Sequence, residues 1–164
     1  MKRDGGLGRF TVLAIASGLG TGYSPFASGT AGSLLGLLVA YVLSCITGLG
    51  GIRYASVIVF LFVIGVYVSG RAEALYGQKD SGKIVIDEIV GMLITLYLMP
   101  ATPTYFVSGF FLFRFFDVLK PFPARRIDQR MGGGLGVMLD DVAAAIYANL
   151  CLWAAKWVVS AAVS

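Results

Sequence analysis

Carboxylates beside apolar segments are the residues of this chain with the clearest potential for chemistry. Asp140 and Asp141 open LDDVAAAIYANLCLWAAKWVV (139–159), a stretch that is almost wholly apolar after its first three residues. A second adjacent pair, Asp87 and Glu88, lies near the start of the apolar stretch at 84–99, and Asp117 lies near the end of another at 104–118. Ionisable groups at membrane depth are expensive, and they are therefore functional candidates by default.

The composition predicts an integral membrane protein with a single domain over residues 1–164. The chain is 57% hydrophobic and 13% charged, whereas soluble domains carry about 25% charged residues. It contains no histidine, which excludes a Ser-His-Asp triad, a histidine metal ligand and a phosphohistidine intermediate. The net charge is +4, but the aromatic residues lie inside apolar runs and are not interleaved with Lys and Arg, which argues against nucleic-acid binding.

Five apolar stretches, separated by Gly, Pro or charged breaks, are the candidate helices: 31–47, 52–70, 84–99, 104–118 and 138–160. A helix that crosses a bilayer needs about 20 apolar residues, a length that the second and fifth stretches reach and the third and fourth do not. The segment 9–17 is too short to span and predicts an interfacial or re-entrant helix. The predicted fold is all-α: a membrane-embedded bundle of about five apolar helices plus a short N-terminal interfacial helix.

The positive charges predict the orientation of this multi-pass bundle. If the helices alternate in direction, the N-terminus and the loops at 71–83 and 119–137 share one face. That face carries most of the basic residues: Lys2, Arg3, Arg9, Arg71, Lys79, Lys83, Lys120, Arg125, Arg126 and Arg130. The opposite face keeps only Arg53 and, near it, Lys156. The positive-inside rule makes the first face cytoplasmic.

The same topology brings the five acidic residues to one depth, on the cytoplasmic side of the bundle. Carboxylates gathered there repel one another unless a cation joins them, and ligands that are all oxygen suit Mg²⁺ or Mn²⁺. A plainer interpretation also covers the pattern. Acidic side chains are favoured at helix N-termini, which accommodates the two adjacent pairs, and Asp117 has an ion-pair partner three residues earlier in Arg114. Spacing alone leaves a metal site and this structural role both open.

Two further segments on this face have residue types suited to a phosphate ester. FRFFDVLKPFPARR (113–126) places Arg114, Lys120 and Arg125 near Asp117, and arginine recognises phosphate through paired hydrogen bonds. These residues also suit anchoring to anionic headgroups. GLGTGYSPFASGTAGS (18–33) supplies backbone amides and hydroxyls, including Ser24 and Thr30, for anion binding. Its small residues equally suit close helix packing, which is the favoured interpretation from physics alone.

Four motifs together resemble the phosphatidylglycerophosphatase A family, in order and at similar spacing. They are GYSPFASGTAGS (22–33), IDEIVGM (86–92), FRFFDVLKPFPARRID (113–128) and GGLGVMLDDVAAA (133–145). The resemblance covers about residues 10–160. The family usually has Pro-Gly-Thr where this chain has Ser28-Gly29-Thr30, a difference that affects loop rigidity without removing an acidic residue.

The resemblance implies a Mg²⁺-dependent phosphatase of the bacterial inner membrane that converts phosphatidylglycerophosphate to phosphatidylglycerol and inorganic phosphate. It makes five acidic residues the candidate catalytic and metal-binding set: Asp87, Glu88, Asp117, Asp140 and Asp141. The candidate substrate-binding residues are Arg114, Lys120, Arg125, Ser24 and Thr30. The expected mechanism is metal-assisted hydrolysis, in which Asp141 or Glu88 takes the proton of the attacking water and Arg114 or Lys120 stabilises the phosphoryl charge. An attacking aspartate is the alternative to direct attack by water.

Three other interpretations compete with the phosphatase. The chain lacks the Asp-Gly-x-x-Ala-Arg signature of the CDP-alcohol phosphatidyltransferases. A small transporter or ion carrier would use the carboxylates as its cation site, but a transporter should have polar residues near the bilayer midplane, whereas these charges gather at one face. A soluble helical bundle remains an alternative because the third and fourth stretches are short.

Overall fold

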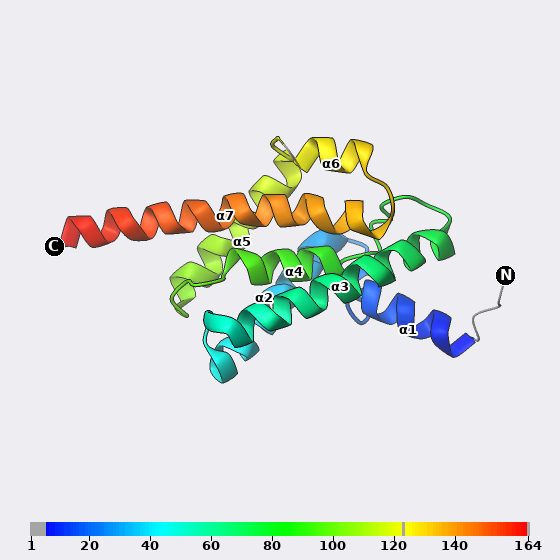
Figure 1. Cartoon of the computed structure of the whole chain (residues 1–164), viewed down its shortest axis with the longest axis horizontal. Coiled ribbons are helices and arrows are strands. Elements are labelled where there is room, and N and C mark those ends of the chain that lie inside the picture. Colours follow the sequence, from blue (N-terminus) through cyan, green and yellow to red (C-terminus); the bar gives the residue numbers. More distant parts are fainter. Residues whose placement is uncertain (1–5, 123, 164) are drawn as a thin grey trace.

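The computed structural model describes residues 6–122 and 124–163. These residues form helices joined by loops and turns, with no strand among them. The helices are α1 (Gly6–Ala16), α2 (Ser28–Thr47), α3 (Gly51–Tyr76), α4 (Ile86–Thr95), α5 (Pro103–Leu119), α6 (Ala124–Arg130) and α7 (Gly133–Val163), with a 3₁₀ turn, η1, at Thr21–Tyr23. The predicted all-α class is confirmed (Figure 1). Each predicted apolar stretch corresponds to a helix, and the N-terminal helix is present as α1. The short helix α6, in the basic segment that follows α5, was not predicted.

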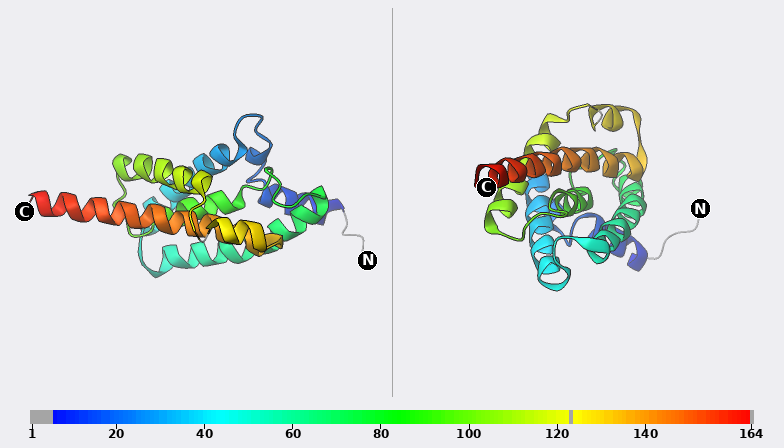
Figure 2. Two further views of the ribbon diagram at one scale, coloured as in Figure 1. Left: turned by 90° about the horizontal axis from the view of Figure 1, so that it is seen from above. Right: turned by 60° about the vertical axis from the view of Figure 1, so that its left-hand side comes forward.

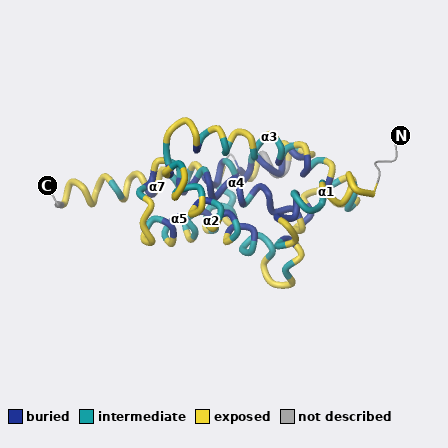
Figure 3. Tube along the Cα trace, turned by 90° about the horizontal axis from the view of Figure 1, so that it is seen from below, coloured by how far each residue is buried: buried dark blue, intermediate teal, exposed yellow. Residues whose placement is uncertain are grey.

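Helix α4 lies at the centre of the bundle. The right-hand view of Figure 2 shows α4 surrounded by α2, α3, α5 and α7. Eight of its ten residues are buried, and Figure 3 shows the buried parts of the chain concentrated around it. At about 1.5 Å per residue, α4 is about half as long as a membrane span. Its first turn therefore lies inside the bundle, enclosed by longer helices.

A stripe of small residues lets α2 lie close against α4. Gly32, Gly36 and Ala40 follow one another at intervals of four residues and are all buried. A Cβ atom added at Gly36 would lie 2.9 Å from the Cα atom of Ile89 in α4, so a larger side chain would force the two helices apart. This is the small-xxx-small pattern of helix packing in membranes, and it confirms the packing interpretation of the segment that contains Gly32.

In the described part of the chain, three helices are long and apolar enough to cross a membrane: Ser28–Thr47, Gly51–Tyr76 and Gly133–Ala162. Their outward faces carry large apolar side chains, such as Phe60 and Val63 on α3, whose exposed fractions are 63% and 61%. An apolar surface of this extent suits contact with lipid and is rarely exposed on soluble monomers. The spans agree with the prediction of a membrane protein, and α5, with 17 residues, lies at the lower limit of spanning length.

The predicted start of the last helix was wrong, and the difference changes how its acidic pair is stabilised. Helix α7 begins at Gly133, five residues before the predicted boundary at 138, so Asp140 and Asp141 lie about two turns inside the helix. The favourable field of a helix N-terminus falls off within the first turn and does not compensate these two carboxylates. Asp87 and Glu88, in contrast, do lie in the first turn of α4.

Candidate active site

Three carboxylates from two helices meet inside the bundle. Asp87 and Glu88 come from the first turn of α4, and Asp141 comes from α7. One carboxylate oxygen of each residue lies within 4.8 Å of the corresponding oxygens of the other two. Asp87 and Asp141 are buried, with exposed fractions of 7% and 4%. We refer to Asp87, Glu88 and Asp141 as the carboxylate trio.

Each member of the trio has a buried oxygen without a hydrogen-bond partner among the described residues. These atoms are Asp87 Oδ1, Glu88 Oε2 and Asp141 Oδ2. An unpaired buried carboxylate costs several kcal/mol, and three within a few ångströms also repel one another. A divalent cation would remove both costs. The donors are all oxygen, which fits Mg²⁺, so the residues present at this position match the ion that the resemblance implies.

A fourth carboxylate, Asp117, lies beside the trio and is paired with an arginine. Arg114 Nη1 donates to Asp117 Oδ2 at 2.5 Å, which confirms the predicted pair at a spacing of three residues in α5. Asp117 is close enough to Glu88 and Asp141 for its charge to act on both. It therefore links the trio to a guanidinium group that is only partly buried, with 21% of its side chain exposed.

The first turns of α2 complete the surroundings of Arg114. Ser33 Oγ lies 3.5 Å from Arg114 Nη1. A Cβ atom added at Gly29 would lie 2.5 Å from Glu88 Oε1 and 2.9 Å from Arg114 Nη1. A side chain here would displace both charged groups, so Gly29 allows the acid of α4 and the base of α5 to share one space beside α2.

The carboxylate of Asp140 contacts a different group from the carboxylate of Asp141. Lys120 Nζ donates to Asp140 Oδ2 at 2.6 Å, and the backbone amide of Asp141 donates to Asp140 Oδ1 at 3.0 Å. Lys120 follows the last residue of α5 in a left-handed conformation, with φ of 45°. Of the five predicted acidic residues, three thus form the trio, while Asp117 and Asp140 each face a cation.

The other predicted substrate-binding residues lie outside this cluster. Ser24 Oγ donates to the carbonyl of Phe26 at 2.9 Å, and Ser24 lines a polar hollow of about 350 Å³ together with Ser28 and Lys83. Thr30 lies in the first turn of α2. Arg125 is exposed on α6, a helix that packs against α7. Each of the three is on the same end of the bundle as the trio, but no contact between them and the trio is recorded among the described residues.

Sequence reasoning missed Ser33 and the role of Gly29. Both lie in the quoted stretch GYSPFASGTAGS, four residues apart, and therefore on one face of α2. That spacing was the available signal, but only the packing of α2 against α4 and α5 shows that this face borders the acidic residues.

The family of the chain follows from comparison with known proteins. The family model described as phosphatidylglycerophosphatase A matches residues 14–156. The chain belongs to the phosphatidylglycerophosphatase A family. The resemblance carried by the four motifs is thereby confirmed. No solved structure matches the chain.

Three relatives of this phosphatidylglycerophosphatase A family member are similar over most of their length. A phosphatidylglycerophosphatase A of Haemophilus influenzae is 39% identical over 144 residues, which cover 87% of each chain. A phosphatidylglycerophosphatase A of Escherichia coli is 38% identical over 133 residues, 80% of this chain and 76% of the relative. A protein of Bacteroides thetaiotaomicron that carries the provisional name phosphatidylinositol-3-phosphatase is 37% identical over 156 residues, 92% of this chain and 96% of the relative.

Proposed function

We propose that this family member is a Mg²⁺-dependent phosphatase that hydrolyses phosphatidylglycerophosphate to phosphatidylglycerol and inorganic phosphate. The observation that carries the proposal is the carboxylate trio, whose unpaired buried oxygens lie within the same cluster as Arg114. The names of the two phosphatidylglycerophosphatase A relatives support the substrate, and the oxygen-only donors support the metal.

In the proposed mechanism Asp87, Glu88 and Asp141 would hold Mg²⁺, which would supply a Lewis acid for the phosphoryl oxygens. Arg114 binds the terminal phosphate and stabilises the charge that develops on it, because a preoriented guanidinium needs little rearrangement during the reaction. Asp117 holds that guanidinium in place through the 2.5 Å hydrogen bond.

The hydrolysis itself breaks one phosphorus–oxygen bond and forms another. Water attacks phosphorus, its proton passes to Glu88 or Asp141, and the bond from phosphorus to the glycerol oxygen breaks. The same carboxylate returns this proton to the leaving glycerol oxygen, and phosphatidylglycerol remains in the membrane. Burial of Asp87 and Asp141 keeps bulk water away from these charges, so each electrostatic contact is stronger than it would be in solvent.

We further propose that the protein lies in the inner membrane of a bacterial cell and that its active site faces the cytoplasm. Figure 1 shows the first turn of α4, the start of α7 and the C-terminal end of α3 toward the same end of the bundle. The basic residues Arg71, Lys79 and Lys83 belong to that end as well, while Arg53 and Lys156 belong to the other. The positive-inside rule assigns the more basic end to the cytoplasm.

The test is phosphate release from phosphatidylglycerophosphate in detergent micelles, with Mg²⁺ and with EDTA. Asp141→Asn is the active-site variant, and Asp80→Asn is its matched control, because Asp80 is an exposed acid of the loop that follows α3. Asp80 has φ of 46°, a conformation that Asn also tolerates. We expect release that requires Mg²⁺, survives in the control and is lost in Asp141→Asn.

Phosphatidylinositol 3-phosphate and phosphatidate are tested beside the main substrate, because one relative is named for the first of these lipids. Faster release from either lipid than from phosphatidylglycerophosphate would overturn the proposed substrate. Release that persists in EDTA would overturn the proposed requirement for a metal. Trapping of a phosphorylated aspartate would overturn the proposed direct attack by water. If the folded protein releases no phosphate from any lipid, cation flux into liposomes becomes the relevant assay.

A further inference from the structure

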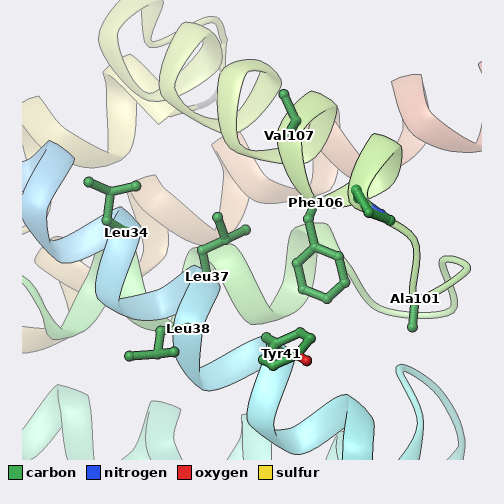
Figure 4. Close-up of a pocket in the computed structure, with 8 residues that line it drawn as sticks. Leu34, Leu37, Leu38, Tyr41, Ala101, Phe106 and Val107 are labelled. Carbon is green, nitrogen blue, oxygen red and sulfur yellow. The ribbon is translucent and has the colours of Figure 1, made fainter.

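We infer that a groove between α2 and α5 holds one acyl chain of the lipid substrate while its phosphate lies at Arg114. The inference rests on the proposed function and extends it to the part of the substrate that does not react. The groove has a volume of about 420 Å³ and is drawn in Figure 4. Its walls are apolar: Leu34, Leu37, Leu38 and Tyr41 from α2, and Phe106 and Val107 from α5, with Ala101 and Pro103 at one end.

Along both helices, residues that line the groove lie one to two turns from the candidate active site. Ser33, whose hydroxyl lies 3.5 Å from Arg114 Nη1, precedes Leu37 of the groove by four residues and shares a face of α2 with it. On α5, Arg114 follows Val107 of the groove by seven residues, about two turns. Farther from this site, Tyr41 and Phe106 meet edge to face, with ring centroids 6.1 Å apart. The two helices thus approach each other near the phosphate site and at the Tyr41–Phe106 contact, whose two residues belong to the groove walls.

The distance from the phosphate site to the Tyr41–Phe106 contact of the groove matches one leaflet of a bilayer. Ser33 and Tyr41 are eight positions apart in α2, and Phe106 and Arg114 are eight positions apart in α5. At about 1.5 Å per residue, the path along either helix is about 12 Å long, while half of a hydrocarbon core of about 30 Å is about 15 Å. An acyl chain that starts from a phosphate at Arg114 would therefore reach the Tyr41–Phe106 contact near the middle of the membrane.

The walls are also available to lipid. Leu34, Leu38 and Val107 have exposed fractions of 52%, 57% and 54%. A second hollow near Arg114 is lined by residues of α5 alone in the described part of the chain, so it lacks an opposite wall. The α2–α5 groove has two walls, so a chain inside it gains packing contacts that the open helix surface does not provide.

The direct test uses phosphatidylglycerol with a photoactivatable diazirine in one acyl chain, incorporated with the protein into liposomes. After irradiation, the labelled peptides are mapped by mass spectrometry. We expect label to concentrate on residues 34–41 and 101–107. Label spread evenly over the outward faces of α2, α3, α5 and α7 would overturn the inference, whatever the activity of the protein.

A kinetic test separates the groove from the phosphate site. Leu38→Trp and Val107→Trp fill the groove, and Val63→Trp on the outer face of α3 is the matched control. With long-chain phosphatidylglycerophosphate we expect the groove variants to raise KM about fivefold, about 1 kcal/mol, with kcat retained. With the deacylated headgroup the groove variants and the control should equal the wild type.

The outcomes distinguish the two proposals. An inactive wild type would contradict the proposed function. The photolabelling would still show whether the groove holds an acyl chain. An active wild type whose KM for the long-chain lipid is unchanged in both groove variants would contradict the groove alone. If Val63→Trp raised KM as much as the groove variants, the effect would belong to the membrane-facing surface in general, and the inference would be wrong.

Discussion

Replacing Gly29 by alanine should disable the site while leaving the fold intact. The added methyl group would lie 2.5 Å from Glu88 Oε1 and 2.9 Å from Arg114 Nη1. Both atoms are the far ends of long side chains, so they can move away without displacing the backbone. The substitution thus acts on the two charged groups between which the phosphate is proposed to lie, and it removes neither of them.

The size of the effect follows from the displacement. Ordinary contact with a Cβ atom begins at 3.4 Å, so Glu88 Oε1 must move by about 0.9 Å and Arg114 Nη1 by about 0.5 Å. A misplacement of about 1 Å at a reacting centre costs roughly 10²-fold in rate. Alanine is favoured over glycine in helices by up to about 1 kcal/mol, so the melting temperature should not fall.

The assay is phosphate release under saturating Mg²⁺, together with thermal unfolding in the same detergent. Gly82→Ala is the matched control, since its added Cβ atom would meet only Ser28 Oγ, at 3.6 Å. We expect Gly29→Ala to lose about 10²-fold in kcat, with Gly82→Ala close to the wild type. A folded Gly29→Ala protein with at least half of the wild-type rate would refute the proposed placement of Glu88 and Arg114.

Three more predictions address the cation, the arginine and the packing of the bundle. Mn²⁺ binding, followed by electron paramagnetic resonance in EDTA-washed protein, should be lost in Asp141→Asn and kept in Asp80→Asn; equal binding in both would place the ion elsewhere. Arg114→Lys should lower kcat by about 10²-fold, since an ammonium group cannot make the paired hydrogen bonds of a guanidinium, and a wild-type rate would remove Arg114 from the mechanism. Gly36→Val should destabilise the bundle by about 1–3 kcal/mol, because its Cβ would lie 2.9 Å from the Cα of Ile89; unchanged unfolding in detergent would contradict the close α2–α4 contact.

Much of the architecture was predictable because hydrophobic runs and charge asymmetry are local properties of the sequence. The five apolar stretches correspond to α2, α3, α4, α5 and α7, and alternation of direction alone brought the acidic residues to one end. The Arg114–Asp117 pair was predictable for the same reason, since residues three apart share a helix face. Helix boundaries were predicted less well: α7 starts at Gly133, where the run of glycines suggested a loop.

Spacing alone could not decide whether the acidic residues bind a metal or have a structural role. The structure shows that the answer differs from one acidic residue to the next. Asp140 and Asp141 are adjacent in sequence, yet Asp140 faces Lys120 and Asp141 joins the trio. Neighbouring residues on a helix point about 100° apart, so the side chains of Asp140 and Asp141 leave α7 in different directions. Which of the two turns inward depends on how α7 is rotated against α4, and no local pattern fixes that rotation.

The sequence by itself determined the class of the protein: an apolar helical chain without histidine, with acids and bases gathered at one end and motifs of a phosphatase family. Only the tertiary structure decided that Asp87, Glu88 and Asp141 meet, that Gly29 leaves room for Glu88 beside Arg114, and that α2 and α5 form an apolar groove. The physical reason is the range of the interactions. Hydropathy and helix periodicity act within a few residues along the chain, whereas the site depends on close packing between α2, α4, α5 and α7, which is set by side-chain shapes that are far apart in sequence.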